Sequence, residues 1–487
     1  MNSAQMIKHS QALLRAAGAV PVRRKGREAW RFPSRAVYPL QVHPGPWRSP
    51  RLFKKVTASI RRAARAERVA CVLGALLLVA GLAGCAHVEQ HLKLPDLAMG
   101  DSSFGPTIEA YTATRVVGGN TVDLLLNGDH IFPAILKAIR SARTTITYAQ
   151  YFYESGEMPQ QIAEALAARC RVGVRAHVLL DGFGAFTMPA SYRQTMMDAG
   201  CEVVTFRPLS PLALLGPFGF GGKSDNRSHR RILVVDGRVG FTGGVGVSPS
   251  WTGNGRTKDH WRQTDVRIEG PVVASLQGAF VENWLEATGA VLGGKAYFPR
   301  LAPHGTVTAQ VVHSSPAEGS FSMYTMFLLA MSSARHSIYI TNPYFLLDAR
   351  MTRALTEASK RGVRVVLLLP GPIDNYMVRH ASRAGFGELF KAGVEIHEYQ
   401  VGLLHAKTMV IDGVWATVGS TNLDTRSFAL NEEVNLVVYS PDVAARLERV
   451  FADDLGYAKR INPETWRDRG AWERVLEALS LPVRREF

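Results

Sequence analysis

Cysteine is scarce in this sequence of 487 residues, with four in total and no pair in Cys-x-x-Cys spacing. That scarcity excludes a disulfide-dense scaffold and a zinc module built from several cysteines. Charged residues make up 20% of the chain and apolar residues 46%, with ordinary numbers of Gly and Pro. This composition excludes wholesale disorder and collagen-like structure, and the length suits two domains with buried cores.

A net excess of basic charge is also nearly absent outside one segment. Of the 57 Lys and Arg residues, 16 lie in residues 1–68 beside two acids, which leaves 41 basic against 39 acidic residues in the rest of the chain. A nearly neutral body lacks the strongly basic face that nucleic-acid binding calls for. We therefore interpret residues 1–68 as a poorly ordered basic extension and expect no nucleic-acid partner.

Long hydrophobic runs are rare, and one alone has the make-up of a membrane-directing segment. Residues 69–88 form an uncharged apolar run after a basic flank, as in signal h-regions and membrane helices. Within the run, Leu82-Ala83-Gly84-Cys85 resembles the bacterial lipoprotein box, in which the cysteine is lipidated and the preceding residues are removed. Residues 89–119 are then a tether to the cell envelope, with the body facing the periplasm. The alternative is an uncleaved inner-membrane anchor.

The remainder of the chain repeats itself. Residues 136–153 align without gaps onto residues 328–345, and two further pairs of segments follow in the same order. Each half alternates segments of helical periodicity with short runs rich in Val, Ile, Tyr and Leu. This alternation predicts an α/β fold of two pseudo-symmetric sandwich halves, residues 120–300 and 301–487, each with a mostly parallel sheet.

Both halves carry the same histidine motif, HRRILVVD in the first and HAKTMVID in the second. Residues two apart on a strand project from the same face, so each histidine and its cation point the same way. Two such pairs facing each other would surround a phosphate with two imidazoles and two cations, which is a phosphodiester site. The motif residues are His229, Arg231, Asp236, His405, Lys407 and Asp412.

These residues resemble the phospholipase D superfamily, whose His-x-Lys-x-x-x-x-Asp motif occurs twice in the two-motif members. Phrases such as RVGFTGG and LHAKTMVIDGVWATVGSTNLDTRSFALNEEVN are most similar to bacterial cardiolipin synthases. The resemblance implies a ping-pong reaction in which one histidine forms a phosphohistidine and the other serves as acid and base. It implies no metal and no other cofactor, because Lys, Arg and Asn groups balance the charge of the phosphoryl oxygens.

The resemblance also implies a substrate and further site residues. It indicates a membrane-associated phosphatidyltransferase that takes phosphatidylglycerol or a similar phospholipid and passes the phosphatidyl group to a glycerol-type alcohol. Asn422 and Ser420 are expected to bind the substrate phosphate. Glu433 is expected to orient His405, and Asp265 is the first-half candidate for the same task, with an ordinary strand acid as an equal alternative.

Two positions of the first half depart from the family pattern, and the two motif aspartates lie in turn-like pairs. Arg231 stands where lysine is usual, and the two cations are not interchangeable. Gly246 stands where the second half has Asn422, which removes a hydrogen bond worth about 1.5–3 kcal/mol at a charged acceptor. Restoring Lys and Asn at these positions is expected to keep or raise activity. Asp236 and Asp412 precede Gly in turn-like pairs, which predicts a structural role.

An apolar insertion, residues 208–222, ends seven residues before His229. Its Gly, Pro and Leu content suits acyl chains or a bilayer surface, and the alternative is a lid folded onto the protein. The competing functions are a phospholipase D hydrolase, an envelope-anchored phosphodiesterase or nuclease, and a non-catalytic lipid-binding protein.

Two of the cysteines precede strands of the first half. Cys170 lies just before VRAHVLL, and Cys201 lies just before EVVTF. Both are therefore expected near one edge of the sheet, where an oxidising compartment would allow a disulfide. The alternative is a pair of buried thiols.

Overall fold

The computed structural model describes residues 20–24, 27–31, 94–209 and 226–480. The chain divides into two compact units, Met1–Lys93 and Leu94–Phe487. In the first unit, strands β1 (Val20–Arg24) and β2 (Arg27–Arg31) form an antiparallel hairpin within the predicted basic arm, where no strand was expected. The predicted membrane-directing run with Cys85, and most of the apolar insertion, lie outside the described residues.

None of the helices in the described ranges is both long enough and apolar enough to cross a membrane.

The second unit contains strands from both halves. Those of the first half are β3 (Val117–Leu126), β4 (Thr145–Gln150), β5 (Arg175–Asp181), β6 (Glu202–Phe206), β7 (Ile232–Val235), β8 (Val239–Gly243) and β9 (Thr264–Glu269). Those of the second half are β10 (Val307–Ser314), β11 (Ser337–Thr341), β12 (Arg364–Pro370), β13 (Glu395–Tyr399), β14 (Thr408–Ile411), β15 (Trp415–Gly419), β16 (Glu433–Tyr439) and β17 (Ala458–Arg460).

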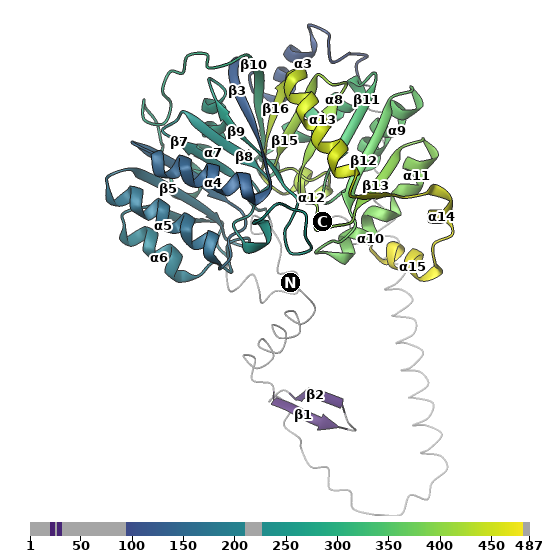
Figure 1. Cartoon of the computed structure of the whole chain (residues 1–487), viewed down its shortest axis with the longest axis horizontal. Coiled ribbons are helices and arrows are strands. Elements are labelled where there is room, and N and C mark those ends of the chain that lie inside the picture. The colour runs from purple at the N-terminus through teal and green to yellow at the C-terminus, as the bar shows by residue number, and fades with distance from the viewer. Residues whose placement is uncertain (1–19, 25–26, 32–93, 210–225, 481–487) are drawn as a thin grey trace, which may run out of the picture. The chain divides into compact units, whose positions relative to one another are not determined.

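All these strands form one sheet of 15 strands, in which both halves use the same order (Figure 1). The first half runs β6-β5-β4-β7-β8-β9-β3, and β3 pairs with β10 of the second half. From there the second half runs β10-β16-β15-β14-β11-β12-β13, with β17 added at the edge. The equivalent order confirms the predicted α/β fold of two pseudo-symmetric halves.

The prediction of mostly parallel sheets was wrong. Only the three outer strands of each half, β4–β6 and β11–β13, pair in parallel. The inner strands are antiparallel, because β7–β8 and β14–β15 are joined by three-residue connections, residues 236–238 and 412–414. A parallel pair needs a crossover of a dozen residues or more.

The second unit also contains thirteen described α-helices and two short 3₁₀ helices, Pro249–Trp251 and Pro316–Glu318. The α-helices are α3 (Phe104–Thr112), α4 (Asn127–Ser141), α5 (Glu157–Arg171), α6 (Ala190–Asp198), α7 (Val273–Thr288), α8 (Ser322–Ser333), α9 (Ala349–Lys360), α10 (Tyr376–Ala384), α11 (Phe386–Lys391), α12 (Thr425–Ala429), α13 (Pro441–Leu455), α14 (Pro463–Arg467) and α15 (Ala471–Ser480).

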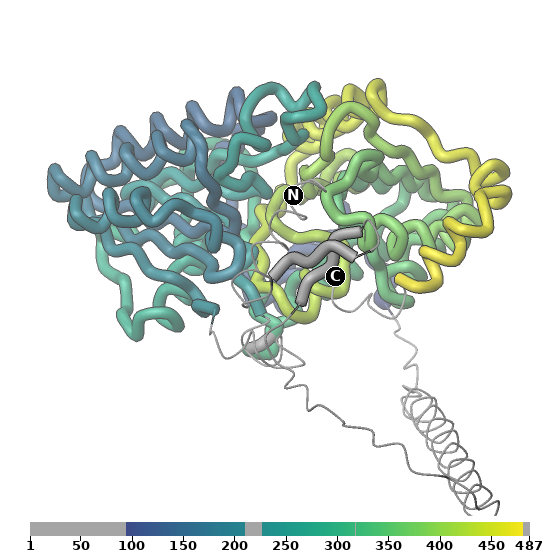
Figure 2. The backbone as a smooth tube through the Cα atoms, turned by 90° about the horizontal axis from the view of Figure 1, so that it is seen from below, coloured from purple at the N-terminus to yellow at the C-terminus, as the bar shows by residue number. Residues whose placement is uncertain are grey.

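Helices cover both faces of the sheet, so the strands are buried on two sides. In β5, Val178 and Leu180 pack with the core beneath α4 and α5, whereas Leu179 packs with the core beneath α7. Residues of α7 and α13 share this last core, which therefore spans both halves. Burial on two faces explains the continuous apolar runs seen in the sequence. Figure 2 shows the blue and teal first half beside the green and yellow second half.

The segment predicted as a tether, residues 89–119, contains a packed helix. Phe104 and Ile108 of α3 are buried in the same core as Met323 and Phe327 of α8 in the second half. The hydroxyl of Ser322 donates to the carbonyl of α3's last residue at 3.2 Å. Apolar residues at helical spacing thus fasten the described part of this segment to the body, so it is not a free linker.

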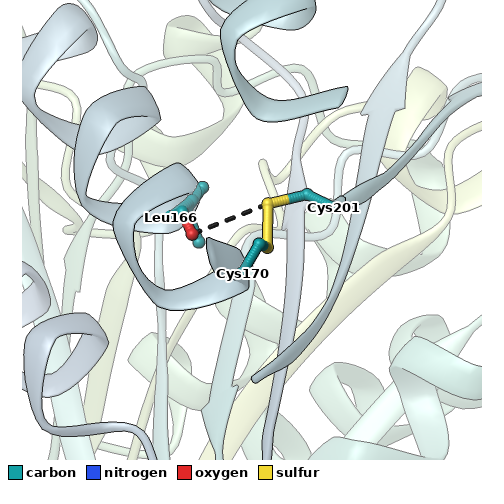
Figure 3. Close-up of a disulfide and its surroundings, with 3 residues drawn as sticks. All are labelled: Leu166, Cys170 and Cys201. Atoms are coloured by element: carbon teal, nitrogen blue, oxygen red, sulfur yellow. Dashed lines mark hydrogen bonds between the residues drawn. A yellow bond between two sulfur atoms is a disulfide. The ribbon is translucent and has the colours of Figure 1, made fainter. Parts of the chain in front are cut away.

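The disulfide predicted between Cys170 and Cys201 is confirmed (Figure 3). It joins the end of α5 to the start of β6, with the two Cα atoms 5.5 Å apart. The sulfur of Cys201 lies 3.6 Å from the carbonyl oxygen of Leu166. In the second half, Ser359 aligns with Cys170 and its hydroxyl donates to the carbonyl of Ala392 at 2.7 Å, so a hydrogen bond connects the equivalent elements.

Candidate active site

The structure brings the two motif histidines together where the halves meet. The backbone N–H of His229 donates to the carbonyl of Glu432 at 2.9 Å, and that of His405 donates to the carbonyl of Arg262 at 2.8 Å. Each motif segment thus pairs with the other half, by two equivalent bridges. His229 precedes β7, which runs antiparallel to β4, so the site lies at the carboxyl ends of the parallel strands. Sites of open α/β sheets commonly lie at this edge.

His229 is held by a carboxylate on one nitrogen and by arginine on the other. Its Nδ1 lies 3.0 Å from both carboxylate oxygens of Glu433. Both terminal nitrogens of Arg231 lie 3.2 Å from its Nε2, and the ring of Tyr151 packs edge-on at 4.9 Å between centroids. Arginine has no acceptor, so Nε2 accepts and the proton of a neutral ring resides on Nδ1.

His405 has a different environment. Its Nδ1 lies 3.3 Å from the amide oxygen of Gln263, and the Nζ of Lys407 lies 3.0 Å from its Nε2 and 3.1 Å from its Nδ1. The rings of Trp251 and Trp261 pack against it, with centroids 5.1 and 5.4 Å away. The imidazole is thus held by a neutral amide, a lysine and two aromatic rings.

The prediction that Glu433 orients His405 and Asp265 orients His229 was therefore wrong. Glu433 contacts His229 and not His405, because the residue before it, Glu432, pairs with the segment that leads into His229 from the first half. Asp265 accepts from the Gln263 amide at 2.6 Å and from the Gly244 N–H at 3.0 Å, so it reaches His405 only through Gln263. Gln263 was not among the predicted partners, because a neutral amide is a less obvious partner for histidine than an acid. Alignment of WRQTD with NEEVN would have found it, since that alignment places Gln263 opposite Glu433.

The two polar residues after the second motif have different surroundings. The hydroxyl of Ser420 donates to Glu433 at 2.5 Å, and that of Ser427 donates to the other carboxylate oxygen at 2.7 Å. The expected phosphate contact of Ser420 is thus replaced by support of Glu433. The side-chain oxygen of Asn422 is buried and has no hydrogen-bond partner among the described residues, which leaves this amide available to a ligand.

Gly246 leaves room for Trp251. A Cβ built at Gly246 would lie 2.9 Å from two ring carbons of Trp251, which is 2% exposed. Because this ring packs against His405, an asparagine at position 246 would push it toward the site. This close approach argues against the prediction that the double change Arg231→Lys with Gly246→Asn keeps or raises activity.

The motif aspartates hold turns at the far ends of their strands. Asp236 and Asp412 have φ of 53° and 54°, and each precedes a glycine that also has positive φ, as a type I′ turn requires. Asp236 accepts from the backbone N–H groups of residues 143–145, and Asp412 accepts from those of residues 335–337. His229 and Asp236 flank β7 at its two ends. Both aspartates are therefore remote from the histidines.

Burial and the concentration of cations determine the charges at the site. Burial, with Arg231 and Lys407 nearby, lowers the pKa of His229 and His405 well below the usual value for histidine. Burial beside Arg231 also lowers the pKa of Lys407. Burial raises the pKa of Glu433 to about 7. Two buried cationic side chains, each beside the histidine of its own motif, form a site that an anionic phosphodiester would stabilise.

Comparisons with known proteins agree with this geometry. Residues 327–455 match the family model for a cardiolipin synthase, PLD-like domain. The chain is 32% identical over 400 residues to cardiolipin synthase 1 of Bacillus anthracis, covering 80% of this chain and 77% of that protein. It is 32% identical over 365 residues to major cardiolipin synthase ClsA of Bacillus subtilis, covering 74% of each chain.

A solved structure shares the fold. Phosphatidylserine synthase of Haemophilus influenzae Rd KW20 superposes with a TM-score of 0.61 at 13% identity, over 79% of this chain and 100% of that chain. The fold and its paired histidine motifs define an enzyme of the phospholipase D type. The chain belongs to the cardiolipin synthase family.

Proposed function

We propose that this enzyme transfers a phosphatidyl group from phosphatidylglycerol or a similar phospholipid, through a phosphohistidine, to a glycerol-type alcohol. The observation that carries the proposal is the pair of buried histidines, each with its own cation, contributed by opposite halves. One imidazole can attack phosphorus while the other exchanges a proton with the alcohol oxygens. Arg231, Lys407 and Asn422 would hold the phosphoryl oxygens.

The alternative acceptor is water, which would make the enzyme a phospholipase D. The surroundings of His405 favour an alcohol, because two indole rings pack on its imidazole and His405 itself is 5% exposed. An acceptor that carries acyl chains would enter such a site with less competition from water.

The purified full-length chain, incubated with labelled phosphatidylglycerol in mixed micelles, tests this proposal. We expect cardiolipin and free glycerol in equal amounts, little phosphatidic acid, and no change when a chelator is added. Phosphatidic acid as the main product would establish hydrolysis. Degradation of single-stranded DNA, with the lipid untouched, would establish a nuclease.

A membrane surface is the second part of the proposal, and α15 supports it. Trp472, Val475 and Leu479 lie at helical spacing on its exposed side, with Trp472 70% exposed. Its Glu477 is buried and pairs with Arg469 at 2.6 Å. This helix turns its apolar stripe outward and one of its two acids, Glu477, inward, which supports a helix that lies in a bilayer interface.

Other exposed apolar residues lie near the catalytic groups. Phe183 and Phe186 follow β5, and Asp181 at the end of β5 accepts from the N–H of Ser228, next to His229. Tyr376, 69% exposed, begins α10, which packs against α15. An enzyme that draws a lipid from a bilayer needs apolar contacts on the side where its site opens, and these elements supply them.

Flotation with vesicles of phosphatidylglycerol and phosphatidylethanolamine tests this surface. The exchange of Trp472 and Leu479 for serine in the full chain should reduce the bound fraction at least about threefold. Tyr111→Ser is the matched control, because Tyr111 is 62% exposed on α3, at the opposite end of the unit from α15 (Figure 1). Equal loss in both variants would contradict a specific membrane face.

We further propose that the catalytic body faces the periplasm and is anchored through Cys85. The lipoprotein-box sequence and the disulfide support this placement, because structural disulfides persist in oxidising compartments. Mass spectrometry of the membrane-bound protein should find a lipidated Cys85 at the N-terminus. An intact segment before Cys85, or unchanged processing of Cys85→Ser, would contradict lipidation and favour a transmembrane anchor.

A further inference from the structure

We propose that Tyr344 and Asp374 form a subsite for the glycerol headgroup of the lipid. The subsite binds the leaving glycerol in the first half of the reaction and the headgroup of the acceptor lipid in the second. This role rests on the proposed phosphatidyl transfer and determines which alcohols take part in it. It is the same whichever motif histidine bonds to phosphorus.

Tyr344 lies just after β11, at the carboxyl ends of the parallel strands, where the site is located. The side-chain oxygen of Asn342 accepts from the N–H of Leu423 at 3.1 Å, and Phe345 forms a β-bridge with the same leucine. The segment that contains Tyr344 therefore runs beside the segment that carries Asn422, whose amide is available to a ligand. This pairing brings Tyr344 to the side of the site that the second half forms.

Asp374 is held against Tyr344. It lies in the connection from β12 to α10, and the hydroxyl of Tyr344 donates to its carboxylate at 2.6 Å. The side chains of Tyr344 and Ile373 pack on the apolar cluster that contains Leu346. The side chain of Asn375 accepts from N–H groups in the first turn of α10. Packing and capping thus fix both members of the pair.

The pair lies within the electrostatic field of the catalytic cations. Burial lowers the pKa of Lys407, Arg231 lowers it further, and the charge of Asp374 is one of those that oppose the shift. Burial raises the pKa of Tyr344 well above its usual value, and Asp374 raises it further. The hydroxyl therefore keeps its proton and serves as a donor. Asp374 is exposed, so its carboxylate can accept from a ligand as well as from Tyr344.

The first half has apolar residues at the equivalent positions. Phe152 aligns with Tyr344 and packs against Trp251, with ring centroids 5.3 Å apart. Ala185 follows β5 at the same distance in sequence as Asp374 follows β12, and it is buried. The two sides of the site therefore differ, as do the two sides of a phospholipid's phosphodiester. The polar pair suits the alcohol that is exchanged, and the apolar side suits the diacylglyceryl group that is retained.

A glycerol unit matches the hydrogen-bonding capacity of the pair. An ionised carboxylate only accepts, whereas a tyrosine hydroxyl both donates and accepts. In the leaving glycerol and in the headgroup of phosphatidylglycerol, the carbon next to the reacting CH₂–O group carries a hydroxyl. That hydroxyl can donate to Asp374, which holds the neighbouring oxygen in place for reaction at phosphorus.

The same subsite serves both steps of the transfer. In an in-line displacement at phosphorus, the leaving and the attacking oxygens lie on opposite sides of the phosphoryl group. The leaving and the entering alcohol each therefore stand opposite the histidine nitrogen, in the same place. Since both alcohols are glycerol units, one Tyr–Asp pair can bind them in turn.

An ammonium headgroup such as ethanolamine is the competing ligand for a carboxylate. It would place a positive charge near Lys407 and Arg231, and like charges in a buried site repel each other. A neutral hydroxyl does not meet this repulsion. The subsite is therefore assigned to glycerol.

The subsite also lies next to the proposed membrane face. Tyr376, 69% exposed, lies two residues after Asp374 and begins α10, which packs against α15. An acceptor lipid whose acyl chains stay at this face can therefore present its headgroup to Asp374.

Competition between two alcohols tests the subsite. The purified full-length chain is given phosphatidyl-p-nitrophenol as donor, which brings no glycerol headgroup, together with equal concentrations of 1,2-propanediol and 1-propanol. These acceptors differ only by the hydroxyl next to the reacting one. The wild type should form the propanediol ester in at least about tenfold excess. The ratio of the two products does not depend on how much of the enzyme is folded.

Asp374→Ala should reduce this ratio about tenfold, because it removes a hydrogen bond to a charged acceptor, and should leave the rate with 1-propanol within about threefold of the wild type. Tyr344→Phe keeps the ring and should reduce the ratio about threefold, since the carboxylate loses the hydroxyl that orients it. Tyr324→Phe is the matched control, because Tyr324 makes the same hydrogen bond to Asp348, at 2.6 Å, in the same half. Its ratio should equal that of the wild type.

A wild-type ratio in both Asp374→Ala and Tyr344→Phe, or an equal fall in Tyr324→Phe, would overturn the subsite while phosphatidyl transfer stands. A wild type that prefers ethanolamine to 1,2-propanediol, offered in the same way, would overturn the assignment to glycerol and give the pair to an ammonium headgroup. Phosphatidic acid alone, with neither ester formed, would refute the proposed transfer itself.

Discussion

At the residue scale, one glycine explains a departure from the repeat. Gly246 occupies the position of Asn422, and Trp251 fills the space that a side chain would take. Where the second half has the amide of Asn422, the first half has the indole of Trp251, which packs on His405. The asymmetry of the loops that follow the two motifs is therefore compensated by packing.

Gly246→Asn should lower activity at least about tenfold, because overpacking next to a buried ring costs about 1–3 kcal/mol and displaces Trp251. Steady-state transfer assays on the folded variant measure the loss, with far-ultraviolet circular dichroism to confirm folding. Gly278→Asn on α7, where a Cβ would meet nothing within 4 Å, controls for the loss of glycine alone. Undiminished activity of Gly246→Asn would show that the indole can move.

Asp424 makes stability depend on pH. Burial raises the pKa of this carboxyl to about 7, above its ordinary value, so the folded chain binds the proton more tightly than the unfolded chain. Its contribution to stability is full below the unfolded pKa near 4 and is lost as pH rises to about 7. Asp424→Asn keeps the cap on α12 without this loss.

The gain in unfolding free energy from Asp424→Asn should therefore be larger at pH 8 than at pH 5. Urea unfolding at the two pH values measures it, with exposed Asp123→Asn as the reference. A gain that shrinks with rising pH would contradict the direction of the shift.

At the element scale, the sequence predicted some pairings and missed others. The helix and strand periods were readable because apolar residues recur at regular spacing, and the alternation of helical with strand-like segments indicated parallel strands, which the outer strands are. The short turns at Asp236 and Asp412 were recognised as turns, but their consequence, antiparallel inner strands, was not drawn. The histidine pairs could be predicted from the repeat. Their cross-half partners could not, because only tertiary pairing sets Glu433 against His229.

The disulfide between α5 and β6 has no counterpart in the second half, where a hydrogen bond joins the same elements. Closing a loop with a sequence separation of 31 should stabilise the first half by about 3–4 kcal/mol through loss of unfolded-state entropy. Denaturant unfolding of the wild type and of the Cys170→Ser, Cys201→Ser double variant measures this difference. A reductant should destabilise the wild type and leave the variant unchanged; a reductant effect on both would locate the sensitivity elsewhere.

At the scale of the whole molecule, the two halves share one sheet and one of the cores. The pairing of β3 with β10 and the packing of α7 and α13 into a common core hold them together without reliance on the chain that connects them. The connecting residues include Val291, which is 81% exposed. We therefore expect the site to survive cleavage of the chain at this point.

A protease site inserted after Val291 should give a cleaved enzyme whose fragments co-elute in size exclusion and retain most of the activity. Transfer activity in the cleaved enzyme would show that the site survives. The uncleaved insertion variant is the control for the inserted residues. If the fragments separate without denaturant, the shared sheet and core do not suffice to hold the two halves together.

Each half supplies a hydrogen-bond partner to the motif histidine of the other half, and this exchange has an evolutionary consequence. Two identical subunits related by a twofold axis would present the same partner to both histidines, because any change in one subunit appears in the other. A single chain that contains both copies is free of this constraint. The internal repeat within one chain therefore permits glutamate beside His229 and glutamine at the equivalent position beside His405, a difference that two identical subunits could not carry.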